Sequence, residues 1–119
     1  MKSRRLERVA EELRAEIARV LREEVADPRV ALVTVLRVDV SPDLRNALVF
    51  WSRIEQKDGP DIETISAGLA SAAGFLRRRL AQELPLQRMP AFTFRYDAAI
   101  EAGDRTLALL RELADEPSE

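Results

Sequence analysis

The stretch from Asp61 to Leu84 constrains the fold more than any other part of this 119-residue chain. Its apolar residues recur at spacings of three and four, which places them on one face of a long helix. Pro60 suits the first turn of that helix, where a missing N–H costs nothing. Two glycines inside it, Gly68 and Gly74, each cost about 1 kcal/mol relative to alanine. The apolar stripe consists of Ile62, Ile65, Leu69, Ala72, Ala73, Leu76, Leu80 and Leu84.

The centre of this helix is expected to bend. Phe75 lies about 140° from Ile62 at the ~100° per residue of a helix, so a straight helix would direct it outward. A break at residues 72–74 would turn the second half of the helix and direct Phe75 toward the core. Three arginines follow the break: Arg77, Arg78 and Arg79. We therefore interpret the stretch as a kinked helix whose second half begins with a positive cluster.

The remaining elements follow from apolar periodicity and from turn residues. We expect a helix at about 4–25, strands at about 31–40, 45–53 and 91–96, and a last amphipathic helix at about 98–113. In the first strand, Val33 and Val35 cannot share a face with Leu32, Leu36, Val38 and Val40 if side chains alternate, so its first half is predicted to be apolar on both sides. The third strand alternates cleanly, with its aromatic residues on one face: Phe92, Phe94 and Tyr96.

This order of elements predicts an α+β domain. The short connection between the first two strands indicates an antiparallel hairpin. A three-stranded sheet with helices packed on one face follows. We expect one domain over residues 1–113, with a short acidic tail at 114–119 that is disordered.

The composition excludes several classes of function. The chain has no cysteine and no histidine, which rules out disulfides, Cys/His zinc sites and histidine-based catalysis. No phosphate-binding loop, dinucleotide fingerprint or calcium loop is present, and no carboxylate pair stands out. Carboxylates remain, so composition does not exclude a hard metal or a carboxylate acid–base pair, but with no such group standing out we expect no enzyme, no metal and no small-molecule substrate. The N-terminus lacks the apolar core of a secretory signal and no apolar run could span a bilayer, so a cytoplasmic protein with no membrane partner is expected.

Charge is distributed unevenly along the chain, although its net charge is only −2. Residues 1–22 carry +3 and residues 75–96 carry +4, whereas residues 23–74 carry −4 and residues 97–119 carry −5. Basic residues are almost all arginine, which favours bidentate contacts to phosphate, although genome composition could produce the same bias. The two positive segments are therefore candidates for nucleic-acid contact, although charge runs are often only solvated faces.

The order helix, strand, strand, kinked double helix, strand is that of a type II K homology domain. Such domains usually hold nucleic acid with a GxxG loop between two helices. This chain has no GxxG, and at the matching place it has Ala72, Ala73 and Gly74. That substitution, together with residues 27–51, 71–97 and 98–110, resembles the ribosome-binding factor A family. The resemblance covers roughly residues 4–111.

The resemblance implies a factor that binds the immature small ribosomal subunit and its ribosomal RNA. It implies help in late maturation, including 5′-end processing of that RNA, with most importance in the cold and with no catalysis or cofactor. We expect a monomer. Many members extend into a basic, flexible C-terminus, whereas this sequence ends short and acidic, a departure that puts any role of such an extension in subunit release or positioning in doubt here.

Candidate site residues follow partly from the resemblance and partly from charge. By resemblance, Ala72 and Gly74 carry the kink, and the surface around Arg77, Arg78 and Arg79 is the expected RNA contact, with Arg88 in the following loop. Further basic candidates are Arg4, Arg5, Arg8, Arg29 and Arg45, of which Arg45 could simply pair with Asp43. The rival interpretation is a protein-interaction or dimerisation module without RNA affinity, which the acidic middle and tail would favour.

Overall fold

The computed structural model describes residues 4–54 and 57–98. A helix α1, Arg4–Glu23, and a 3-10 turn η1, Pro28–Val30, precede the hairpin strands β1, Val33–Val40, and β2, Asn46–Arg53. Helix α2, Ile62–Glu83, then leads to strand β3, Ala91–Tyr96. The expected helix at 98–113 and tail at 114–119 lie outside the described residues, apart from Ala98.

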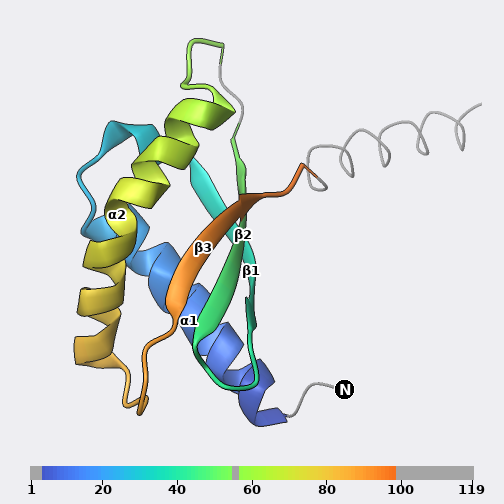
Figure 1. The fold of residues 1–119 in the computed structure, drawn as a ribbon. Coiled ribbons are helices and arrows are strands. Elements are labelled where there is room, and N and C mark those ends of the chain that lie inside the picture. The colour runs from blue at the N-terminus through green and yellow to red at the C-terminus, as the bar shows by residue number, and fades with distance from the viewer. Residues whose placement is uncertain (1–3, 55–56, 99–119) are drawn as a thin grey trace, which may run out of the picture.

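The sheet has the order β1-β2-β3, with β1 antiparallel and β3 parallel to β2. Both helices cover one face of this sheet (Figure 1). The parallel β2–β3 pair requires a crossover connection, and α2 supplies it. The predicted α+β fold with a three-stranded sheet and helices on one face is therefore confirmed.

The core lies between the helices and this covered face. From α1, it takes Val9, Leu13, Ile17, Val20 and Leu21, and from α2 it takes Ile65, Leu69, Ala72, Leu76 and Leu80. The strands contribute residues such as Val49 and Trp51, neither of which is exposed to solvent. The predicted aromatic face of β3 is confirmed, because Phe92, Phe94 and Tyr96 are half-buried while their neighbours are exposed.

A β-bulge in β1 corrects the prediction that its first half is apolar on both sides. The pairing with β2 shifts between Val35 and Arg37, so Leu36 has no direct partner. One extra residue reverses the alternation of side chains beyond it. Val33 and Val35 therefore point to the same covered face as Val38 and Val40, and the whole strand contributes one continuous apolar face.

Helix α2 begins at Ile62, two residues after Pro60, so the prediction that this proline occupies the first helical turn is wrong. Asp61 is the N-cap, and its Oδ1 accepts a hydrogen bond from the N–H of Thr64 at 2.8 Å. Pro60 precedes the cap and its carbonyl accepts from the Arg53 guanidinium at 3.0 Å, so it lies outside the helical turns. This hydrogen bond anchors the entry to the helix on the end of β2.

The centre of α2 is helical without interruption across Ala72, Ala73 and Gly74. A kink changes the direction of a helix without ending it, so the kink at these residues stays a prediction. The expectation that Phe75 turns inward is wrong, because its side chain is 38% exposed. At ~100° per residue it keeps the outward position of a continuous helix.

Candidate nucleic-acid interface

Three segments that are far apart in the sequence meet at one end of the molecule (Figure 1). They are the first turns of α1, the turn between β1 and β2, and the loop from Leu84 to Pro90. The N–H of Ala91 donates to the carbonyl of Arg45 at 2.9 Å and joins the end of the loop to the hairpin. One open cavity at this junction is bordered by Arg45 and Arg88, and its neighbour is bordered by Arg5. We call this junction the basic end.

The turn that carries Arg45 is fixed by a local hydrogen-bond network. Ser41 Oγ donates to Asp43 Oδ1 at 2.7 Å and accepts from the N–H of Asn46 at 3.0 Å. The N–H of Leu44 donates to the carbonyl of Ser41 at 2.9 Å. Leu44 adopts a left-handed φ of 60°, which costs a non-glycine residue about 1 kcal/mol. Its half-buried side chain packs on the core and borders both cavities, so packing holds the turn in this strained form.

The arginines of the basic end are little compensated by carboxylates. Arg45 Nε lies 3.8 Å from Asp43 Oδ2, and both side chains are mostly exposed, which makes a weak ion pair. The pKa of Asp43 is lowered chiefly by the hydroxyl of Ser41, with Arg45 contributing less. Arg5 and Arg88 are exposed and form no ion pair within residues 4–54 and 57–98. The same holds for the neighbouring exposed arginines of α1, Arg4 and Arg8.

The three consecutive arginines of α2 have three different environments. Arg77 donates from Nε and Nη2 to the carbonyl of Met89 at 3.2 and 3.1 Å, and no carboxylate of residues 4–54 and 57–98 pairs with its charge. This contact ties the helix turn that carries Arg78 to the loop that carries Arg88. Arg78 is exposed and has no hydrogen-bond or ion-pair partner in the described part of the chain.

Arg79 belongs to an ion-pair cluster between the two helices. Its Nε lies 2.7 Å from Glu24 Oε1 and its Nη2 lies 2.6 Å from Glu83 Oε1. Arg19 joins the same carboxylates, 3.0 Å from Glu24 and 2.7 Å from Glu83. The hydrogen bond from Arg79 is the largest cause that lowers the pKa of Glu24. We call these residues, with Glu16 and Glu23, the interhelical cluster, and within it the charge of Arg79 is compensated.

Arg29 is also compensated, and it lies away from the basic end. Its guanidinium donates to both carboxylate oxygens of Asp27, with the shortest contact at 2.7 Å. Its Cβ packs against α2 at Gly68, where an added Cβ would lie only 2.9 Å away. Gly68 and Arg78 are ten residues apart, or about 15 Å along a helix. The structure therefore assigns Arg29 a packing role at the crossing of η1 and α2.

Sequence reasoning had grouped all of these arginines together. The i,i+4 spacing of Arg79 and Glu83 was a usable signal of an ion pair. The partner Glu24 lies 55 positions earlier and gave no such signal. The close crossing at Gly68 was also missed. A glycine within a helical pattern indicates a loss of helix stability, but it does not indicate which segment packs against it.

No group of acidic residues within the described ranges has the arrangement of a metal site. None of the described helices combines the length and apolar character that crossing a membrane requires.

The sequence model of the family described as ribosome-binding factor A matches residues 5–110 of the chain. Several ribosome-binding factors A are similar over most of their length. The Marinomonas protein is 42% identical over 91% of this chain and 84% of its own. The Alkalilimnicola ehrlichii protein is 39% identical over 94% of this chain and 85% of its own. The Aromatoleum aromaticum protein is 38% identical over 92% of this chain and 84% of its own.

Solved structures show the same fold. The crystal structure of ribosome-binding factor A from Thermus thermophilus has a TM-score of 0.66 and 23% identity, covering 76% of this chain and 94% of that one. The solution structure of a Thermotoga maritima protein described as a putative ribosome binding factor A has a TM-score of 0.65 and 24% identity, with coverage of 80% and 89%. A homology model of the Thermus thermophilus factor, fitted into a cryo-EM map of its complex with 30S, has a TM-score of 0.53 and 29% identity, covering 73% and 93%.

Proposed function

Because this chain belongs to the ribosome-binding factor A family, we propose that it binds the immature small ribosomal subunit as an assembly factor. A related factor has been placed in a complex with 30S, and the relation covers most of both chains. The factor acts by holding a ribosomal RNA conformation until maturation is complete. It carries out no chemistry of its own, uses no cofactor, and works as a monomer in the cytoplasm.

The observation that supports the RNA-contact site is that some of the arginines form ion pairs with carboxylates and others do not. Arg78 and Arg88 keep exposed charges without carboxylate partners in the described chain, and Arg5 lies with Arg88 at the basic end. Phosphates attract such charges, and each phosphate neutralised releases counterions from the RNA. We assign the contact to the basic end together with Arg77 and Arg78, and we leave Arg29 and Arg79 out of it.

Sedimentation with ribosomal particles from cold-grown cells tests the proposal. The protein should travel with free small subunits at ~50 mM salt and much less at ~200 mM, because several phosphate contacts give a steep salt dependence. The double variant Arg78→Glu, Arg88→Glu should lose this association while keeping its melting temperature, since both positions are exposed.

A matched control separates a site from net charge. The double variant Arg22→Glu, Arg95→Glu makes the same charge change at exposed positions on α1 and β3. It should sediment with the subunit nearly as the parent protein does. Equal losses in the two double variants would refute the assigned site. Association that does not respond to salt would favour the rival protein-interaction module.

We further propose that the factor assists 5′-end processing of the small-subunit RNA, with most effect in the cold. Cells that carry only the Arg78→Glu, Arg88→Glu variant should accumulate unprocessed 5′ ends at low temperature, measured by primer extension. Normal processing in cells whose factor no longer binds the particle would contradict this role.

A further inference from the structure

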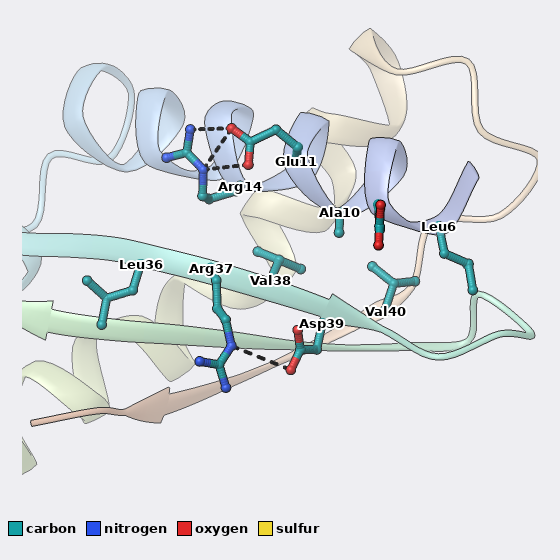
Figure 2. A pocket seen from close by; sticks show the side chains of 10 residues that line it. Leu6, Ala10, Glu11, Arg14, Leu36, Arg37, Val38, Asp39 and Val40 are labelled. Carbon is teal, nitrogen blue, oxygen red and sulfur yellow. Dashed lines mark hydrogen bonds and ion pairs between the residues drawn. The ribbon is translucent and has the colours of Figure 1, made fainter. Parts of the chain in front are cut away.

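A groove follows the outer edge of β1, between this strand and α1. Figure 2 shows the half that lies beyond the bulge, a cavity of about 320 Å³ bordered by residues 36–40 of β1 and by α1. A second cavity of about 340 Å³ is bordered by residues 30–35. Arg14 of α1 lines both cavities. The two cavities therefore accompany the full length of the strand.

The edge of β1 beside this groove is free to accept another strand. β1 is at the end of the sheet order, and no other described segment pairs with its outer side. In the hairpin, the N–H of Ser41 donates to the carbonyl of Asn46 at 2.9 Å. In an antiparallel pair every second residue forms hydrogen bonds with the neighbouring strand, so Asp39, two residues before Ser41, also directs its backbone groups toward β2. The backbone N–H and C=O groups of Val38 and Val40 consequently face away from β2. Such unpaired groups are a template for an added strand.

The bulge limits what this edge can accept. Bulges and charged side chains are common devices that prevent edge-to-edge association of sheets. Here the irregularity at Leu36 interrupts the edge, so a long added strand cannot stay in register along all of β1. Residues 37–40 after the bulge are regular, and Ala10 and Val38 line the groove beside them (Figure 2). The edge therefore suits a short extended segment.

The charges that line this half of the groove favour a positive occupant. Among the described residues, three carboxylates and two arginines line it. Glu11 is held by Arg14 at 2.6 Å, and Asp39 lies 3.6 Å from Arg37. Glu7 is exposed and has no ion-pair partner in residues 4–54 and 57–98. The net negative charge disfavours RNA phosphate, and a second copy of the chain would bring the same net charge against itself.

We propose that residues 37–40 bind a short, extended, basic segment of a protein component of the small ribosomal particle, added as a strand beside β1. Its backbone pairs with Val38 and Val40, one apolar side chain lies over Ala10, and a lysine or arginine faces Glu7. The assignment of the partner to the particle rests on the proposed function. Main-chain pairing supplies affinity in this mode of recognition, and the side-chain positions supply selectivity.

Synthetic peptides test the groove without the particle. Overlapping peptides of about 12 residues, twice a usual strand length, would cover the proteins of the small subunit and be titrated with the full chain by fluorescence anisotropy. Peptides with a basic residue beside alternating apolar residues should bind. Their binding should slow hydrogen exchange at the amides of Val38 and Val40.

Two pairs of variants locate the binding. Glu7→Lys should weaken the peptides about tenfold, because a like charge replaces an opposite one. Glu63→Lys should not, although Glu63 also lies in the first turn of its helix and is exposed. Ala10→Trp should fill the groove and block the peptides, whereas Ala67→Trp on the exposed side of α2 should leave them bound.

The inference is overturned if no peptide binds, if the members of each pair behave alike, or if exchange at Val38 and Val40 does not change on binding. Sedimentation of the same proteins separates the two proposals. Association with small subunits but no peptide binding would remove the groove assignment alone. Loss of both would remove the proposed function as well.

Discussion

The inner and outer sides of α2 carry the same residue types and use them in opposite ways. On the inner side, Gly68 permits close packing under η1, and Arg79 is enclosed by the interhelical cluster. On the outer side, Gly74 is exposed, and Arg78 has no partner in the described chain. A glycine or an arginine in this helix is therefore structural or available for binding according to what packs against it. The separation predicts that stability and subunit binding can be changed independently.

The largest effect on stability should come from the inner glycine. In Gly68→Ala the new Cβ would lie 2.9 Å from the Cβ of Arg29 and 3.0 Å from Cγ1 of Val30, so η1 or α2 must shift. Overpacking of this kind costs about 1–3 kcal/mol, only partly offset by the better helix propensity of alanine. Urea unfolding measures the loss. A stability equal to that of the parent would mean that η1 can move away from α2 at little cost in free energy.

The two neighbouring arginines should divide binding from stability. Arg78→Gln should weaken subunit association about tenfold and lower its salt slope by about one, as for the loss of one phosphate contact. Its melting temperature should not change. Arg79→Gln should leave association intact and lower the melting temperature, because Glu24 and Glu83 lose one of their two cations. Reversal of these two phenotypes would contradict the division of α2 into two sides.

The outer glycine should respond with the opposite sign from Gly68. In Gly74→Ala the one close neighbour of the new Cβ among the described residues is Nη1 of Arg78 at 3.3 Å, the far end of a flexible side chain. Alanine should therefore stabilise the helix by up to about 1 kcal/mol. Thermal unfolding beside the parent protein measures this gain. A clear loss of stability would instead support a kink at residues 72–74 that requires glycine.

The smallest effect should be the pH dependence of the interhelical cluster. The pKa of Glu24 in the folded protein is lowered, chiefly by the hydrogen bond from Arg79 and further by Arg19. A lowered pKa contributes stability above the ordinary glutamate range, and this contribution is lost as pH falls through the folded value. The melting temperatures of the parent and of Arg79→Gln should therefore differ near neutral pH and approach each other in acid. A constant difference would show that Arg79 acts through packing alone.

Local sequence patterns predicted those features of the fold that depend only on residues adjacent in the chain. Strand β3 was predicted with its observed bounds, because alternation of aromatic residues needs no knowledge of other segments. The bulge at Leu36 was missed, since one extra residue in a β-branched run has no signature of its own. The prediction that the first half of β1 is apolar on both sides was wrong for the same reason. The register with β2 shows that the apolar side chains of β1 lie on one continuous face.

The candidate site was less predictable than the fold. The sequence located the segments rich in arginine, but it could not distinguish the arginines that form ion pairs from those that do not. That sorting depends on carboxylates from distant segments, such as Glu24 for Arg79, and on the turn at Leu44 that places Arg45 beside Arg88. The role of the sorted arginines stays a prediction until binding is measured.

The burial of Trp51 has a practical consequence for optical measurements. It is the only tryptophan of the chain, its side chain is not exposed, and its ring lies 5.0 Å from that of Tyr96. Intrinsic fluorescence therefore originates in the core, away from the exposed arginines of α2. Unfolding should change this emission, while a ligand at the surface should leave it nearly constant. The native chain thus contains its own probe of folding, and a dye on the RNA can report binding in the same sample.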